Sequence, residues 1–329
     1  MAIPNRLVRA LARPLLLAGM VLAAASASLA QSYPNKPIRL IVPFSPGGGA
    51  DSLARPLSER LRAKLGQTIV IENKAGAGSN IGTAEVAQAK PDGYTLLINT
   101  DAIAIYQHLY SNLRYDVWKD LTPVGYVADS PLVLAVTPSL PANTLKELVD
   151  LAKRQPNKFN FANSGQGSPH HLAFELLART TGIDVTQVNY KGGGQSVTDV
   201  LAGHTEIGMF TYGAVRQYIA AGSLKALALM TQKRSELAPN IPTAVESGWP
   251  SVHVGLRFVV MAPAGTPKDI VDKLQAAIAE VCNEPEFRQT LKQQGYEPFV
   301  TTPAQTATLL RAEYDRWGPI LKAANIRLD

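Results

Sequence analysis

The sequence predicts a two-lobed α/β protein in which each lobe is a sheet flanked by helices. Three observations lead to this prediction. Short apolar segments typical of strands alternate with helical patterns, the series restarts later in the chain, and long extended runs separate the two series. A chain of 329 residues is also longer than one typical hydrophobic core supports, so we expect two domains.

The first series of elements begins with an apolar strand at 38–42. A turn rich in proline and glycine follows, and then a helix at about 51–65. Apolar side chains at spacing four place one face of that helix against the core, namely Leu53, Leu57, Leu61 and Leu65. A strand at 68–72, a helix that Ser79 or Asn80 can cap, and a strand at 95–98 complete a β-α-β-α-β order. This order favours a parallel sheet covered by helices.

The second series has the same rhythm. Its helices are expected to start near Ser168, Gly194 and Ala214, between strands at 159–162, 185–188, 206–210 and 224–230.

Two extended runs lie between the series, at 126–136 and 252–262. We interpret them as the two hinge segments that cross from lobe to lobe and back. The helices after residue 267 should return to the first lobe. The predicted domain 1 is therefore discontinuous, with residues 31–133 and 256–329, and domain 2 comprises residues 134–255.

The first thirty residues have the pattern of a secretory signal peptide. Arg6, Arg9 and Arg13 form a positive segment, an apolar run at 15–25 follows, and Ser28-Leu29-Ala30 offers the small residues that a signal peptidase reads. We expect export by the general secretory route and cleavage before Gln31. No cysteine lies near that site, so no lipid anchor is expected, and the mature protein should be free in the periplasm.

Composition disfavours several classes of protein. Those three arginines account for half of the net charge of +6, and no dense cluster of Lys and Arg exists, so no nucleic-acid partner is expected. The only cysteine, Cys282, cannot form an intramolecular disulfide and is predicted to be a buried side chain of an amphipathic helix. We expect a monomer without a cofactor or a metal.

Three loops rich in glycine and serine connect strands to helices, at 43–51, 75–80 and 163–171. Glycines let backbone N–H groups approach a ligand closely, and the dipole of the following helix favours an anion. In the third loop Ser168 is a candidate N-cap, with Pro169 at the first helical position. Any one loop alone is best interpreted as an ordinary turn. Two such helix starts in different lobes indicate a cleft that holds a carboxylate.

The spacing of other residues disfavours enzymatic and nucleotide-binding sites. The glycines at 76–82 miss the dinucleotide-binding spacing by one residue, and the turn at 46–49 lacks the Lys-Ser/Thr of a phosphate loop. Ser168 does not lie in a Gly-x-Ser-x-Gly elbow. His171 and Glu175 have helical spacing, but no second pair with metal-ligand spacing accompanies them. No catalytic residue and no metal ligand is assigned.

Taken together, these motifs resemble the Bug (TctC-like) substrate-binding receptors of tripartite tricarboxylate transporters. The resemblance covers essentially all of the mature chain, in order, and the motifs are specific jointly rather than singly. The matching segments are 43–51 (PFSPGGGAD), 72–78 (ENKAGAG), 90–95 (KPDGYT), 162–168 (ANSGQGS) followed by His171-Leu172, 188–192 (VNYKG) and 261–267 (MAPAGTP).

The resemblance implies a type II periplasmic-binding-protein fold whose two lobes close around a ligand. It also implies a ligand carboxylate held by backbone amides, hydroxyls and ordered water, and transport partners in the form of a large and a small membrane subunit. Together with Ser79 of the second glycine-rich loop, the candidate ligand-binding residues of the first lobe are Phe44, Ser45, Gly47, Gly48, Asn99 and Thr100. Those of the second lobe are Ser164, Gly165, Ser168 and Tyr190.

One departure from the family's pattern concerns Arg257, a position where the family usually carries Trp. An arginine near a cleft can hold a second carboxylate in bidentate fashion. We hypothesise that Arg257 reads the distal end of a dicarboxylate, aliphatic or aromatic, with an aromatic one stacked near Phe44. The alternative is an arginine exposed at the rear of the hinge.

The sequence thus leaves three functions of different class. The first is a receptor that delivers a small carboxylate to a tripartite tricarboxylate transporter. The second is a receptor that presents its ligand to a signalling partner, and the same fold can serve both. The third is an exported hydrolase-type enzyme that uses Ser168 and His171. The lack of any catalytic or metal-binding spacing disfavours this third function, so we expect a binding protein and not an enzyme.

Overall fold

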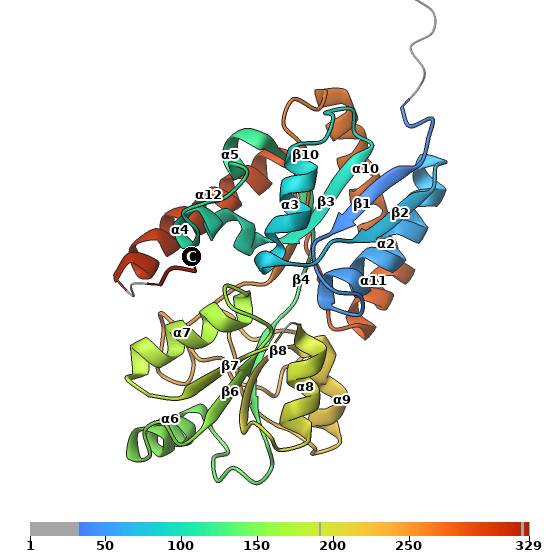
Figure 1. Cartoon of the computed structure of the whole chain (residues 1–329). Coiled ribbons are helices and arrows are strands. Elements are labelled where there is room, and N and C mark those ends of the chain that lie inside the picture. Colours follow the sequence, from blue (N-terminus) through green and yellow to red (C-terminus); the bar gives the residue numbers. More distant parts are fainter. Residues whose placement is uncertain (1–32, 191, 324–325, 329) are drawn as a thin grey trace, which may run out of the picture. The chain divides into compact units, whose positions relative to one another are not determined.

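The structure is a computed structural model that describes residues 33–190, 192–323 and 326–328. Its contacts divide the chain into residues 1–36 and residues 37–329, and both sheets belong to the second of these parts (Figure 1). The predicted signal peptide at 1–30 lies outside the described residues. Within the described ranges, none of the helices has both the length and the apolar character that a membrane crossing requires.

The first sheet has six strands in the order β11-β4-β10-β3-β1-β2. They are β1 (Ile38–Val42), β2 (Ile69–Asn73), β3 (Thr95–Thr100), β4 (Leu121–Asp129), β10 (Arg257–Pro263) and β11 (Glu297–Pro298). β1 runs parallel to β2 and β3, as predicted, whereas β10 runs antiparallel to β3 and β4. The sheet is therefore mixed, because β10 arrives from the other lobe without the crossover helix that a parallel neighbour needs.

The helices of the first lobe include two long ones that flank this sheet. They are α2 (Gly49–Leu65), α3 (Asn80–Ala87), α4 (Tyr106–Leu109), α5 (Val117–Asp120), α10 (Lys268–Asn283), α11 (Pro285–Gln293) and α12 (Pro303–Ala323), with 3-10 turns η1 (Ala77–Ser79) and η2 (Asp101–Ile105). α2 buries the predicted leucine face and ends at Gly66, whose left-handed backbone lets its N–H donate to the Arg62 carbonyl. α10 packs on α2 and β4, so the C-terminal helices return to the first lobe as predicted.

The second sheet has five strands in the order β7-β6-β8-β5-β9. They are β5 (Leu132–Val136), β6 (Asn160–Asn163), β7 (Thr186–Asn189), β8 (Ile207–Thr211) and β9 (Lys225–Leu229), with helices α6 (Leu145–Arg154), α7 (Pro169–Thr181), α8 (Gly193–Leu201) and α9 (Tyr212–Ala220). β6 runs parallel to β7 and β8, whereas β5 runs antiparallel to β8 and β9. The two-lobed α/β architecture predicted from the sequence is confirmed.

The chain passes between the sheets through segments that lie side by side. β4 ends at Asp129 and β5 begins at Leu132, and the return segment leads from β9 to β10. The Ser130 N–H donates to the Leu256 carbonyl of the return segment at 3.0 Å, and within the return segment the Val254 N–H donates to the Met230 carbonyl at 2.8 Å. The domain boundaries predicted at 133/134 and 255/256 lie close to these crossings and stay a prediction.

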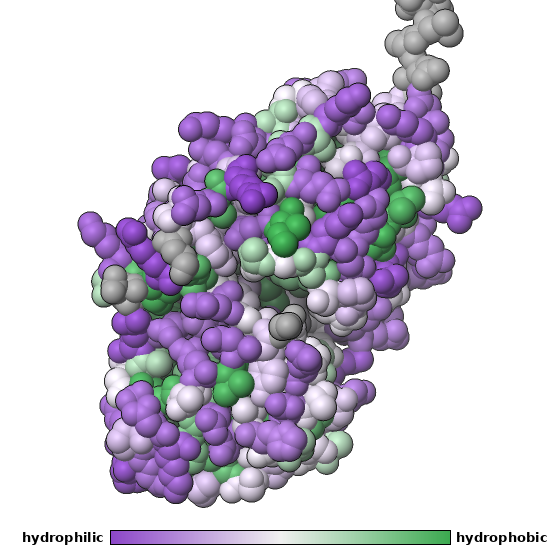
Figure 2. All heavy atoms as spheres, viewed as in Figure 1, coloured by the Kyte–Doolittle hydropathy of each residue, from purple (hydrophilic) through white to green (hydrophobic). Residues whose placement is uncertain are grey.

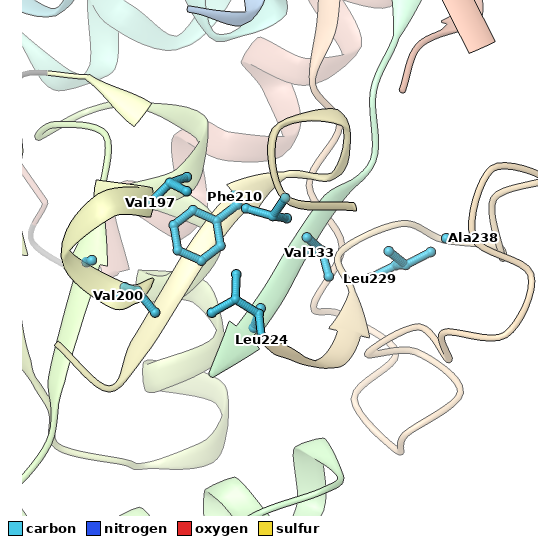
Figure 3. Packing of buried hydrophobic residues seen from close by; sticks show 10 residues of the cluster. Val133, Val197, Val200, Phe210, Leu224, Leu229 and Ala238 are labelled. Atoms are coloured by element: carbon cyan, nitrogen blue, oxygen red, sulfur yellow. The ribbon is translucent and has the colours of Figure 1, made fainter. Parts of the chain in front are cut away.

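The core of the second lobe joins its sheet to α8 and α9, as Figure 3 shows for Val133, Val197, Val200, Phe210, Leu224, Leu229 and Ala238. The side chain of Tyr190 packs against this cluster from the end of β7. In the first lobe Cys282 is fully buried in α10, as predicted, and burial raises the pKa of its thiol to about 12. The core therefore positions the strand ends from which the candidate loops extend.

Candidate functional site

The first loop, between β1 and α2, is held from inside by Asp51. This carboxylate is 2% exposed, accepts the Gly47 N–H at 2.9 Å and pairs with both Nε and Nη2 of Arg55 at 2.9 Å. Asn73 donates to Asp51 at 3.0 Å and to the Phe44 carbonyl at 3.1 Å. Although burial opposes ionisation, these hydrogen bonds hold the pKa of Asp51 below its usual value. Asp51 and Asn73 thus fix the shape of this loop from inside, and the predicted ligand-binding residues lie on its outer side.

The outer surface of this loop carries the predicted residues. Ser45 and Gly47 are exposed, whereas Phe44 and Gly48 are half-buried. Gly47 has a φ of 78°, which favours glycine, and its N–H is already used by Asp51. α2 begins after Gly48 without a side-chain cap. The groups that this loop offers to a ligand are therefore the Ser45 hydroxyl and the first N–H groups of α2.

The second loop leads into a buried hydrogen-bond network. Ser79 is 2% exposed with a φ of 80°, and its Oγ donates to Tyr106 Oη at 3.1 Å. Asn99 Nδ2 donates to Ser79 Oγ at 3.2 Å and to Thr83 Oγ1 at 3.1 Å. The side chains of Ser79 and Asn99 therefore form hydrogen bonds to each other and to their neighbours. These hydrogen bonds support the end of β3 from within.

Thr100, the last residue of β3, donates its N–H to Asn99 Oδ1 at 2.7 Å, but its side chain takes no part in that network. Its hydroxyl is buried, the residue is 4% exposed, and Oγ1 has no hydrogen-bond partner among the described residues. Leaving a buried hydroxyl unpaired costs about 1–3 kcal/mol. Such a cost is recovered when a ligand supplies the missing partner, so Thr100 is the predicted residue with the clearest unused hydrogen-bonding capacity.

The third loop joins β6 to α7 in the second lobe. Ser168 Oγ accepts the His171 N–H at 3.2 Å, so the predicted N-cap with Pro169 at the first helical position is confirmed. His171 Nδ1 accepts the Gly167 N–H at 3.3 Å. Ser168 and His171 are therefore occupied by the helix start itself, and their geometry is that of a cap and not of a nucleophile with its base.

Ser164 is linked to a histidine that stays neutral. Its Oγ lies 2.7 Å from His170 Nδ1, and His170 Nε2 lies 3.2 Å from Thr211 Oγ1. Burial lowers the pKa of His170 to about 4, so the ring is uncharged near neutral pH. Gly165, with a φ of 124°, donates its N–H to Asn163 Oδ1 at 2.8 Å. The third loop thus offers polar groups without a formal charge.

Tyr190 and the start of α8 lie next to each other in the chain. The Tyr190 hydroxyl donates to Asp199 Oδ2 of α8 at 2.5 Å, so its proton is used in a hydrogen bond within the second lobe. α8 begins at Gly193 without a side-chain cap, and among the described residues nothing lies within 4 Å of a Cβ placed on Gly192 or Gly193. The helix start predicted near Gly194 is confirmed, but it is not among the predicted ligand-binding groups, although consecutive glycines at a helix start favour an anion.

The two lobes approach each other beside these loops. A Cβ placed on Gly78 would lie 3.8 Å from the Gln166 carbonyl oxygen, and Tyr110 Oη would lie 3.2 Å from a Cβ on Gly167. The second loop of the first lobe and the third loop of the second lobe are therefore neighbours. Figure 2 shows the surface hollowed between the two lobes.

Arg257, at the start of β10, is surrounded by carboxylates of its own chain. Its guanidinium lies 3.9 Å from Asp101 Oδ2, 3.8 Å from Asp129 Oδ2 and 3.7 Å from Glu313 Oε1. It lines a cavity of about 420 Å³ with Arg316, and none of the predicted loop residues lines that cavity. The hypothesis that Arg257 reads a distal ligand carboxylate stays a prediction, and in this structure three carboxylates already share its charge.

Within the described ranges no group of three or more His, Cys, Asp or Glu residues has the arrangement of a metal site. The polar groups at the strand ends suit reversible binding of a small anion by neutral donors.

Comparison with known proteins gives one consistent result. The family model described as "Tripartite tricarboxylate transporter family receptor" matches residues 53–326. Protein BugT of Bordetella pertussis is 37% identical over 301 residues, which cover 91% of this chain and 92% of that protein.

Two solved structures of similar proteins were determined with a ligand. An R. palustris protein with adipate has a TM-score of 0.85 and 34% identity, and the match covers 90% of this chain and all of that one. MatC from Rhodopseudomonas palustris with bound malate has a TM-score of 0.82 and 30% identity, over 88% of this chain and all of that one.

Proposed function

The chain belongs to the tripartite tricarboxylate transporter receptor family, and from this premise we propose that it captures a small dicarboxylate in the periplasm and delivers it to a tripartite tricarboxylate transporter. The family and the solved neighbours are solute-binding proteins with a two-lobed periplasmic-binding fold, so the chain is a binding protein and not an enzyme. We propose three things beyond the family: that the ligand is a dicarboxylate, that it binds between the two lobes, and that membrane subunits of the transporter receive it.

The unpaired hydroxyl of Thr100 is the observation that best supports the proposed site. It is buried at the carboxyl end of β3, where ligands of α/β sheets commonly bind. β1, which pairs with β3, ends in the loop that contains Ser45, and β6 of the second sheet ends in the loop that contains Ser164. In the proposed complex one ligand carboxylate lies between these loops and accepts hydrogen bonds from hydroxyls and helix N–H groups.

A dicarboxylate is favoured over other anions by the relatives. Adipate and malate, which the two similar structures carry, each have two carboxylates on a short aliphatic chain. Phe44 is half-buried at the edge of the first loop and offers an apolar surface to the carbon chain, aliphatic or aromatic. The bound anion needs no dedicated cation in this arrangement, because several neutral donors share its charge.

A thermal-shift screen of the purified protein against mono-, di- and tricarboxylates tests the proposed ligand class. At a concentration of 100 times Kd a ligand adds about 2.7 kcal/mol to the free energy of unfolding, which gives a visible rise in Tm. We expect this rise for at least one dicarboxylate. A flat response to every carboxylate tested would contradict the proposal.

The Thr100→Val variant tests the proposed place. Valine keeps the shape and removes the hydroxyl, so the variant should fold and bind the selected dicarboxylate roughly tenfold more weakly. Thr308→Val is the matched control, because Thr308 is exposed on α12. Equal affinities of the wild type and Thr100→Val would place the ligand elsewhere.

A further inference from the structure

Asp101 is a buried carboxylate at the junction of the two lobes. It begins η2 directly after β3, is 4% exposed, and lines a cavity of about 20 Å³. The first lobe contributes Glu313 and Trp317 to this cavity. The second lobe contributes Pro169 and Leu172 from the first turn of α7. A cavity of this size holds about one water molecule, and residues of α7 form part of the wall that separates Asp101 from solvent.

The charges around Asp101 do not balance. Arg257 is the cation next to it, and its guanidinium is shared by Asp101, Asp129 and Glu313 at distances of 3.7–3.9 Å. Asp101 Oδ1 also accepts the Arg257 N–H at 3.3 Å. One positive charge thus faces three carboxylates, none of them at hydrogen-bond distance from the guanidinium.

Further ionisable groups surround this cluster on each packed element. Arg316 of α12 pairs with Glu313 at 3.4 Å, and Glu297 of β11 lies opposite Asp129. The remaining groups are Tyr126 of β4, Tyr106 of α4 and His253 of the return segment. Pro169 and Leu172, which α7 contributes, carry no charge, so α7 removes water without supplying a counter-ion.

These surroundings favour a proton on Asp101. Burial, together with the negative charge of Glu313, raises the pKa of Asp101 to about 7 against the opposing effect of Arg257. Burial also raises the pKa of Asp129, to about 6. The largest cause for Asp101 is burial, and the cavity beside it is closed in part by Pro169 and Leu172 of the second lobe.

We propose that Asp101 takes up a proton when the second lobe closes over it, so that ligand binding by this protein is coupled to pH. The proposal rests on the proposed function for its main readout, because closure is followed through the affinity for a ligand bound between the lobes. No covalent chemistry is involved, since the proton comes from solvent and returns to it when the lobes separate.

The direction of the coupling follows from the two states. In the closed state the pKa of Asp101 is raised, and separation of the lobes admits water and brings it back toward its ordinary value. The closed state therefore binds more protons, so closure is favoured as pH falls and is weakened as pH rises through about 7. If the ordinary value is fully regained on opening, ligand affinity should increase about tenfold from pH 8 to pH 6.

The experiment is a calorimetric titration with adipate between pH 6 and pH 8, in two buffers of different ionisation enthalpy. Wild-type protein should bind more tightly at pH 6 and take up protons. Asp101→Asn, which imitates the protonated acid, should bind with equal affinity at both pH values and take up none. Asp269→Asn is the matched control, because Asp269 is exposed in the first turn of α10, and it should behave as wild type.

A second variant keeps the test valid if Asp101→Asn does not fold. Glu313→Gln removes a neighbouring negative charge, so the pH at which affinity declines should be lower than in wild type. Affinity independent of pH in wild type, or the same pH dependence in wild type and Asp101→Asn, would overturn the proposal.

Failure of the proposed function has a different signature, in which no carboxylate of the thermal-shift screen binds at any pH. Small-angle scattering of the ligand-free protein then tests whether closure itself depends on pH. The radius of gyration should decrease as pH falls through 7 in wild type but not in Asp101→Asn. A radius that stays constant in wild type would refute coupled closure.

Discussion

Gly213 is the residue at which a single added methyl group should hold the lobes apart. It lies in the first turn of α9, and a Cβ placed there would lie 2.1 Å from the Gln294 carbonyl oxygen and 3.2 Å from Gly295 Cα in the first lobe. These are backbone atoms, which cannot rotate away. Restoring an ordinary contact requires the two backbones to separate by roughly 1 Å.

The Gly213→Ala substitution should therefore weaken ligand binding without weakening the fold. Overpacking of this kind costs about 1–3 kcal/mol, which corresponds to a roughly 5- to 150-fold loss of affinity if the cost falls on the closed state alone. With the lobes apart, alanine is the better helix residue by up to about 1 kcal/mol, so the Tm of the ligand-free variant should be unchanged or higher.

Two measurements on Gly213→Ala test this reasoning, a calorimetric affinity for the dicarboxylate selected by the screen and a ligand-free melting curve. Ala214→Ser is the control, because Ala214 is the next residue of the same turn and is exposed. Unchanged affinity in Gly213→Ala would refute the steric argument. A large fall in the ligand-free Tm would show that the contact is needed for folding and not for closure.

Three further predictions concern buried or paired groups. Asp51→Asn should weaken ligand binding about tenfold or more, because the charge-assisted bonds that shape the first loop are lost, and calorimetry against Asp269→Asn checks this. The Cys282 thiol should resist a thiol reagent at pH 8 in the native protein and react after unfolding in urea, and rapid native labelling would contradict its burial. Arg257→Ala should weaken binding of diacids more than of monoacids if this guanidinium reads a distal carboxylate, and equal loss for both, or no loss, would exclude that role.

Much of the fold follows from local sequence patterns. The strand at 38–42, the leucine face of α2 and the cap at Ser168 are short-range features, so spacing and residue type are sufficient to predict them. α6 is not among the elements predicted from the sequence, although Thr144 accepts the Glu147 N–H at 3.1 Å and the pattern Thr-x-x-Glu is typical of such a cap. The antiparallel strands β5 and β10 were expected as extended segments, but their place within the sheets depends on pairing between distant residues.

The candidate site was less accessible from sequence, for a physical reason. Whether Ser79 and Asn99 face a ligand or each other depends on a left-handed φ at Ser79 and on the position of Tyr106, 27 residues away. The carboxylates around Arg257 come from separate elements, and Asp101 precedes Arg257 by 156 residues. Local patterns identify loops with polar groups, whereas the choice between ligand and internal partner is made by packing.

The position of a bound dicarboxylate in a crystal structure of this protein tests the central claim most directly. We predict one carboxylate within hydrogen-bond distance of Thr100 Oγ1, between the loops that contain Ser45 and Ser164. A dicarboxylate bound instead in the cavity beside Arg257 and Arg316, with Thr100 Oγ1 still unpaired, would contradict the account.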